Sequence, residues 1–181
     1  MERFFSMFTR KNVVNFFFVD DIAHQTGHVI LTATTANRKG SFIIDETLQL
    51  SILLNDVTEY RSFYTLFHAL YTYHSITLCL DKILKSKVLS IAMEKEAIGR
   101  IGFYMLKFEA DLQQFNKVIM HFTSIEFALT FLGIEIFQLI EKQHDYMFME
   151  WNPVVEEFNY QKQAYNYSHK VFLIDNTSYY A

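Results

Sequence analysis

The segment from Ser75 to Lys142 limits the possible folds of this chain more than any other. Four short runs, in which apolar residues recur at every second position, precede one long apolar stretch. The four runs are Ile76–Leu80, Val88–Met93, Ile101–Phe108 and Lys117–Phe122. A period of two is typical of a β-strand with one covered face. The segment therefore predicts a four-stranded meander that is closed by a helix.

The closing helix is predicted over Ile125–Lys142, where Thr123 and Glu126 have the spacing of a capping box. Apolar residues cover most of its circumference, and a helix of this kind needs neighbours on more than one side. A chain of 181 residues offers limited cover for such a helix. We therefore expect its second face to form an oligomer interface. The predicted interface residues are Phe127, Phe131, Ile134 and Phe137.

The first half of the chain predicts a similar order of elements. Strands are expected at Val13–Val19, His28–Thr35 and Ser41–Ile44, with a turn over Asp20–Gly27. A helix is expected over Val57–Tyr73, where aromatic residues recur at helical spacing. The predicted fold class is thus α+β, with two antiparallel β-meanders, each followed by a helix, in the order ββββα-ββββα.

The domain organisation follows from a change of composition near the only proline, Pro153. Residues 1–150 are predicted to form a single α+β domain. Residues 151–181 are rich in polar and aromatic side chains and are predicted to form a C-terminal extension, with one short strand at Val171–Ile174.

The chemistry of the side chains predicts no catalytic site. The seven His residues show no metal-ligand spacing with a supporting Cys or carboxylate, and the five Gly residues form no phosphate-binding loop. We therefore expect a protein without catalytic residues, metal or cofactor. The single cysteine, Cys79, excludes an internal disulfide and fits a reducing intracellular compartment, with the mitochondrion and the nucleus as open alternatives. No apolar run has the length of a membrane span.

Aromatic residues beside cationic ones are the strongest functional signal, since single-stranded nucleic acid binds by base stacking and by contacts to its phosphates. Aromatic residues make up 17% of the chain. The candidate contact residues on strands and strand ends are Lys11, Phe16, Phe18, Arg38, Lys39, Lys85, Lys87, Arg100, Tyr104 and Lys117. The alternative interpretation is that these aromatic rings belong to the core and that the charges are solvated.

The charge distribution argues against binding driven by phosphate contacts alone. Residues 124–181 contain 3 Lys or Arg against 8 Asp or Glu, which accounts for the net charge of −4. A nucleic-acid-binding protein usually carries a basic surplus.

The order of elements resembles that of the Whirly family and its relatives, the kinetoplastid mitochondrial guide-RNA-binding proteins and the small single-strand-binding transcriptional coactivators. Arg38-Lys39-Gly40 before a strand, Lys87 to Ile91, and Phe122 to Phe127 before the last helix carry this likeness over residues 11–142. The lysine-rich first strand and the hairpin tryptophan of that family are missing. The resemblance implies binding of single-stranded DNA or RNA by a tetramer whose final helices pack together.

Three functional hypotheses follow. The leading one is a non-enzymatic single-strand-binding protein that acts as a homo- or hetero-oligomer. The second is a structural subunit of a larger assembly, with the same fold but without nucleic-acid binding. The third is an enzyme for a small molecule that carries no recognisable motif.

Overall fold

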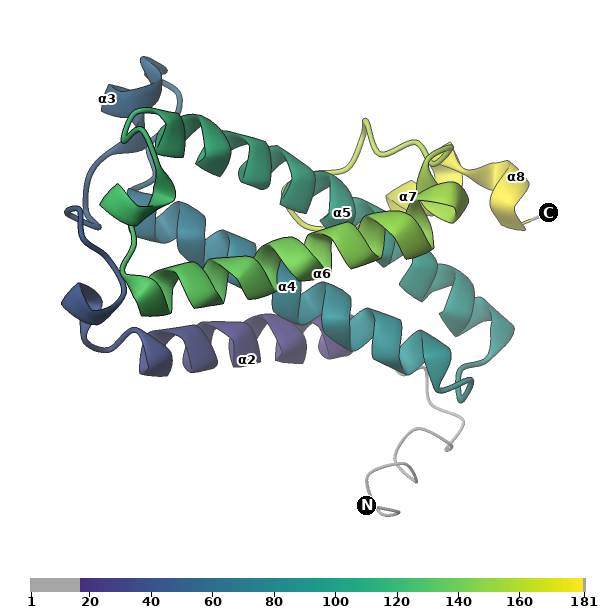
Figure 1. The fold of residues 1–181 in the computed structure, drawn as a ribbon. Coiled ribbons are helices and arrows are strands. Elements are labelled where there is room, and N and C mark those ends of the chain that lie inside the picture. The colour runs from purple at the N-terminus through teal and green to yellow at the C-terminus, as the bar shows by residue number, and fades with distance from the viewer. Residues whose placement is uncertain (1–16, 181) are drawn as a thin grey trace.

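The computed structural model describes residues 17–180, which form a bundle of helices (Figure 1). The long helices are α2 (Phe17–Thr34), α4 (Phe63–Lys85), α5 (Ile91–Met120) and α6 (Phe131–Val155). Shorter helices connect them or follow them, namely η1 (Arg38–Gly40), α3 (Leu50–Leu54), η2 (Ile125–Phe127), α7 (His169–Asp175) and α8 (Thr177–Tyr180). Helix α4 is central, because it packs against α2, α5 and α6.

A hydroxyl side chain caps the start of each long helix after α2. The Ser62 hydroxyl accepts a hydrogen bond from the Thr65 amide at 3.2 Å, and Ser90 and Thr130 cap α5 and α6 in the same way. These bonds satisfy amides that have no partner within the first turn of a helix. The sequence therefore marks the helix starts with Ser or Thr, one residue before the first helical position.

The main core lies between α4, α5 and α6 and is built from aromatic rings. The Phe115 ring stacks on Phe63 at 5.4 Å and on Phe137 at 4.5 Å, measured between ring centroids. All three side chains are buried. Such stacked rings add pair energy to the hydrophobic gain from burial.

The C-terminal segment folds back onto α5. The Tyr160 hydroxyl donates a hydrogen bond to the Gly99 carbonyl at 2.8 Å, and Phe172 is fully buried. A Cβ atom on Gly99 would lie 2.6 Å from the Tyr167 hydroxyl, so glycine is needed for this close approach. The predicted boundary between residues 150 and 151 lies inside α6, which continues to Val155.

The prediction of an α+β fold with two β-meanders is wrong, because the structure has no β-strand within residues 17–180. Ile76–Leu80 lies inside α4, and both Ile101–Phe108 and most of Lys117–Phe122 lie inside α5. His28–Thr35 belongs mainly to α2, and Val171–Ile174 belongs to α7. Isolated bridges join Phe42 with Leu129 and Gln49 with Ser62, and neither corresponds to a predicted strand pair.

Strands were predicted in place of helices because the apolar pattern was considered over short windows. Windows of five to eight residues fit a strand and a buried helix equally well. Over the whole of α5, buried residues recur at spacings of three and four, as expected for one side of a helix. The series is Ala97, Ile101, Met105, Phe108, Leu112, Phe115 and Val118.

The two predicted helices are present but shifted along the chain. The helix predicted at Val57–Tyr73 is α4, which starts at Phe63. The helix predicted at Ile125–Lys142 is α6, which starts at Phe131 after the Thr130 cap. Thr123, the predicted cap, instead adopts a φ of 71° in the turn after α5. Over the described range, no helix combines the length and apolar character needed to cross a membrane.

Candidate interaction surface

A groove of about 630 Å³ runs between α2 and α6, with α4 as its floor. Leu31 and Thr34 of α2 form one wall, and Tyr71 of α4 lies below. The other wall is α6, which contributes Leu132, Glu135, Ile136, Gln138, Leu139 and Lys142. Among these, the residues that α6 exposes define the α6 face: Leu132, Glu135, Gln138, Leu139 and Lys142.

The α6 face is apolar at its centre and is extended by exposed aromatic residues. Leu139 is 55% exposed, and Leu132 lies seven residues before it on the same side of the helix. Phe131 at the start of α6 is 77% exposed, and Phe127 in η2 is 63% exposed. Exposed apolar residues that adjoin a groove are typical of a protein-binding surface.

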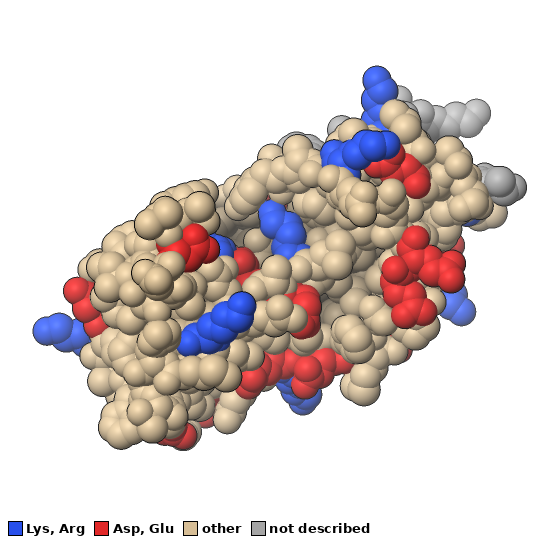
Figure 2. Space-filling model, turned by 90° about the horizontal axis from the view of Figure 1, so that it is seen from above, with Lys and Arg blue, Asp and Glu red and all other residues tan. Residues whose placement is uncertain are grey.

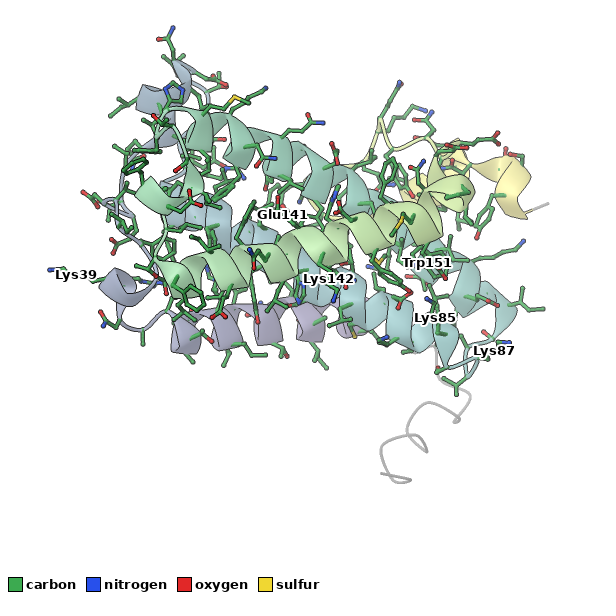
Figure 3. The ribbon with its side chains drawn as sticks, in the orientation of Figure 1. Lys39, Lys85, Lys87, Glu141, Lys142 and Trp151 are labelled. Carbon is green, nitrogen blue, oxygen red and sulfur yellow. The ribbon has the colours of Figure 1, made fainter. Side chains whose placement is uncertain are left out.

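Two opposite charges lie on the α6 face at a separation of seven residues. Glu135 and Lys142 are both exposed and both line the groove. Their separation is about 10 Å along the helix axis, which is too far for an ion pair within one helix. Figure 3 shows Lys142 on α6. The charges are therefore placed to meet partners outside this helix.

The four predicted interface residues are divided between surface and core. Phe127 and Phe131 are exposed beside the groove. Ile134 is half-buried against the main core, and Phe137 is buried against Phe115. The residues that the sequence analysis missed are Leu132 and Leu139, whose spacing of seven residues was the available signal.

Two of the predicted nucleic-acid contacts are engaged inside the protein. The buried guanidinium of Arg100 donates to the Asp20 carboxylate at 2.6 Å and to Glu96 at 2.7 Å. The Tyr104 hydroxyl also donates to Asp20, at 3.1 Å. Burial raises the pKa of the Asp20 carboxyl, although Arg100 acts in the opposite direction. These groups tie α2 to α5.

Two further candidates have partners at the surface. The Lys85 ammonium lies 3.2 Å from the Asp81 carboxylate and 3.0 Å from that of Glu150. The guanidinium carbon of Arg38 lies 3.5 Å from the centre of the Tyr64 ring. Both cations therefore contribute to contacts between elements of this chain.

The remaining candidates do not form a joint platform. Lys39 and Lys87 lie at opposite ends of the molecule (Figure 3), and Lys117 is exposed near the end of α5. In Figure 2, Lys and Arg side chains are scattered among Asp and Glu side chains. The other three candidates, Lys11, Phe16 and the side chain of Phe18, lie outside the described residues.

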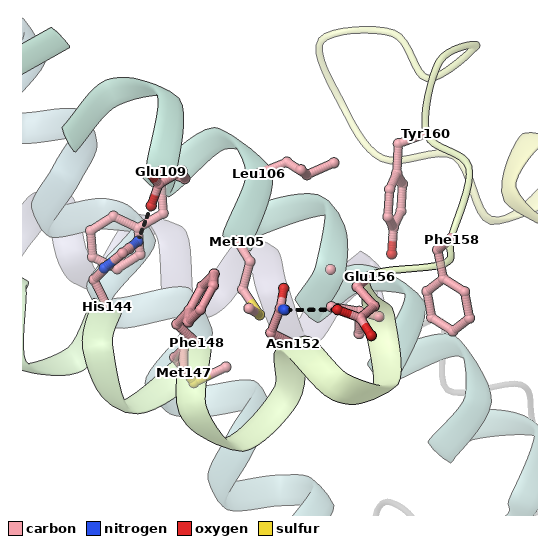
Figure 4. Close-up of a pocket in the computed structure, with 13 residues that line it drawn as sticks. Met105, Leu106, Glu109, His144, Met147, Phe148, Asn152, Glu156, Phe158 and Tyr160 are labelled. Carbon is pink, nitrogen blue, oxygen red and sulfur yellow. Dashed lines mark hydrogen bonds and ion pairs between the residues drawn. The ribbon is translucent and has the colours of Figure 1, made fainter. Parts of the chain in front are cut away.

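A second hollow, of about 120 Å³, lies between α5, α6 and the segment that follows α6 (Figure 4). In its wall, His144 Nε2 lies 2.6 Å from the Glu109 carboxylate. Met105, Met147 and Phe148 form apolar parts of the lining. The lining has no Ser, Thr, Cys or Lys side chain that this histidine could activate as a nucleophile.

Three histidines form a hydrogen-bonded chain where α2 meets α4. His28 Nε2 lies 2.6 Å from His24 Nε2, and His28 Nδ1 lies 2.7 Å from His68 Nε2. Burial lowers the pKa of His24, and burial with the neighbouring cations lowers that of His68 to about 4. The sequence analysis missed this group, because the turn predicted over Asp20–Gly27 hid the i, i+4 spacing of His24 and His28.

The histidine chain does not have the geometry of a metal site. His28 directs its two ring nitrogens to different neighbours, so the three rings do not converge on one point. In the part of the chain that the structure describes, no group of three or more His, Cys, Asp or Glu side chains is arranged to hold a metal ion.

Comparison with known proteins gives no further guidance on function. No protein family, curated protein or solved structure matches this chain at a significant level.

Proposed function

We propose that this chain is a non-enzymatic structural subunit that associates with a second copy of itself through the α6 face. The observation that carries the proposal is the pair of opposite charges, Glu135 and Lys142, on either side of the exposed Leu139. A two-fold symmetric interface brings each residue opposite a fixed partner on the other copy. The opposite charges on the α6 face could meet this condition in an antiparallel pair of helices.

The register follows from the positions of the charges. If two α6 helices pack antiparallel about an axis between Gln138 and Leu139, Glu135 of each copy lies opposite Lys142 of the other. The two Leu139 side chains then meet near the axis and exclude water from the centre of the contact. Leu132 extends the apolar stripe by two turns on each side of the axis. Two ion pairs thus flank one apolar centre.

Sedimentation velocity from low to high micromolar concentration tests the association. We expect the unmodified chain to form a dimer and Leu139→Glu to be monomeric, because two carboxylates would then meet near the axis in place of two apolar side chains. Val57→Glu serves as the matched control, since Val57 is 95% exposed and lies outside the groove. A chain that stays monomeric at high micromolar concentration would contradict the proposal.

Charge reversal tests the register separately. Glu135→Lys and Lys142→Glu should each weaken the dimer by about tenfold or less, as expected for solvent-exposed pairs. The double variant should recover most of the loss, because it exchanges the two signs at the interface. A double variant as weak as the sum of both single variants would exclude this register while leaving self-association intact.

Binding of single-stranded DNA or RNA stays a prediction from the sequence. The sheet on which it was based is absent from the described residues, and its candidate contacts are dispersed. Salt-dependent binding of a labelled single strand that is lost in Lys39→Glu and Lys87→Glu would support it.

A further inference from the structure

The histidine chain can bind only a limited number of protons while it is intact. A contact between two ring nitrogens is a hydrogen bond only if one of them carries a hydrogen and the other does not. The two contacts of His28, at 2.6 and 2.7 Å, therefore hold two hydrogens among four nitrogens. The outer Nδ1 atoms of His24 and His68 add at most one hydrogen each.

The total is therefore at most four hydrogens on three rings. Three neutral imidazoles already carry three hydrogens, so the intact chain accepts one additional proton. In the separated state, all three rings can be charged. Unfolding of α2 breaks both contacts and is consequently coupled to an uptake that approaches two protons, or three if the intact chain stays neutral, as the pH falls below about 6.5.

We propose that the chain of His24, His28 and His68 is a proton-operated latch that releases helix α2 from α4 at mildly acidic pH. The positions of the three rings support this role. His24 and His28 lie on α2 and His68 lies on α4, so the bond from His28 to His68 joins the two helices, and the bond from His28 to His24 lies within α2. Like charges on adjacent rings would push α2 away from the bundle.

The surroundings of the latch contain few groups that could neutralise this charge. His24 faces Asp21 on its own helix and Lys107 on α5, and His68 faces Arg38. Tyr64 stacks against the His68 ring at 5.3 Å between ring centroids. The adjoining hollow is lined by three further tyrosines: Tyr73, Tyr104 and Tyr165. Burial raises the pKa of Tyr73 and Tyr104, so these two hydroxyls stay neutral in acid.

One group near the start of α2 acts in the opposite direction. Burial raises the pKa of the Asp20 carboxyl, although Arg100 acts against this, so this group reduces the net proton uptake on opening over the pH range in which it titrates. The histidine substitutions leave Asp20 in place, so we expect its effect to drop out when the pH slopes of the variants are compared.

Release of α2 has a consequence for the groove, which rests on the proposed function. Leu31 and Thr34 on α2 form one of the two walls of the groove. When α2 separates from α4, the second copy loses its contacts with the α2 wall of the groove. We therefore expect the dimer to weaken over the same pH range.

Amide hydrogen exchange, corrected for the intrinsic exchange rates, measures the opening of α2 between pH 6.5 and 5. Peptides from residues 17–34 report the latch, and peptides from residues 101–118 of α5 are the internal reference. The opening constant of α2 should rise about 100-fold per pH unit, because a two-proton uptake gives a slope of two. The opening constant of α5 should stay well below that of α2 throughout this range, because α5 is exposed only when the whole bundle unfolds.

Substitutions that remove one contact or both should change the slope in steps. His68→Phe leaves only the contact between His24 and His28, so opening is coupled to the uptake of one proton. We therefore expect the opening constant of α2 to rise about tenfold per pH unit. His28→Phe removes both contacts, so the rise that remains comes from the burial of His24 and His68 alone and should be smaller than in the unmodified chain. His121→Phe is the matched control, because His121 is an exposed histidine at the end of α5, and it should retain the 100-fold rise.

Two results would overturn the latch. One is an equal slope in the unmodified chain, His68→Phe and His28→Phe. The other, which needs no variant, is an NMR titration in which all three rings become charged while α2 stays protected. Repeating the exchange measurement in the Leu139→Glu monomer separates the two proposals, because α2 should open with the same slope even if self-association does not occur.

Discussion

Helix α4 is bordered on two sides by contacts of different chemistry. On the side of α5 and α6, its rings stack in a continuous aromatic core around Phe115. On the side of α2, three histidines meet, and the buried pair of Asp20 with Arg100 ties α2 to α5. Apolar packing is indifferent to pH, whereas hydrogen-bonded and charged groups require a defined number of protons. We therefore expect the stability of the α4–α5–α6 core to depend little on pH and the attachment of α2 to depend on it more strongly.

The largest expected effect comes from the aromatic core. Phe115→Ala should lower the free energy of unfolding by about 3–5 kcal/mol, because it leaves a cavity between the Phe63 and Phe137 rings. Urea denaturation followed by circular dichroism measures this loss. Phe131→Ala, at a position that is 77% exposed, is the control and should change stability by about 0.5 kcal/mol or less. Equal losses in both variants would remove the distinction between core and surface rings.

The buried ion pair beneath α2 should give the next largest effect. Arg100→Met leaves the Asp20 carboxylate buried without its cation, which should cost about 3 kcal/mol of stability. The same denaturation experiment measures it. Glu150→Gln breaks a half-exposed pair with Lys85 and should cost about 1 kcal/mol at most. If Arg100→Met proved as mild as Glu150→Gln, the pair would not be what holds α2 to α5.

The pH dependence of global stability tests the lowered pKa of His74, a histidine of α4 near α6. Burial lowers the pKa of His74, so the unfolded chain takes up a proton below about pH 6.5 that the folded chain does not. The stability that the neutral His74 side chain contributes is therefore present above about pH 6.5. This contribution is lost as the pH falls, by at most about 1.4 kcal/mol per pH unit for this one residue. His74→Phe should reduce the decline measured by urea denaturation at pH 7 and pH 5.5. His121→Phe should leave it unchanged.

The smallest effect is expected at a helix start. Ser62→Ala removes the acceptor for the Thr65 amide and should destabilise the protein by about 1 kcal/mol. A shift of the urea midpoint measures this change. Ser86→Ala at the other end of α4 should cost less, because that hydroxyl donates to a carbonyl that water can also reach. A larger loss at Ser86 would contradict the capping argument.

The sequence predicted the positions of two helices better than the fold class. It located α6 through its apolar content and α4 through its aromatic spacing, both with shifted starts. It failed for α5, whose residues were divided among short predicted strands, although Gly99 and Gly102 both lie within this one helix. There the reason for glycine is the close approach of Tyr160 and Tyr167, which are about 60 residues away in the chain.

The candidate site residues likewise show that local sequence patterns do not predict tertiary contacts. The apolar character of the last long helix indicated an interface, but only packing decided that Phe137 faces the core and Phe131 faces solvent. Arg100 looked like a strand-end cation and is instead neutralised by Asp20, eighty positions earlier in the sequence. The partner of a charge is a matter of tertiary structure, because side chains of distant segments compete for it.

By itself, the sequence determined the amount of apolar surface to be buried, the helix caps and the lack of an internal disulfide. These properties depend on residue type and on near neighbours, which a single chain displays directly. The tertiary structure decided that the short apolar runs join into long helices, because burial on several sides is available only once α4 is surrounded. It also decided that His24, His28 and His68 meet, since helical geometry brings the first two together and packing against α4 supplies the third.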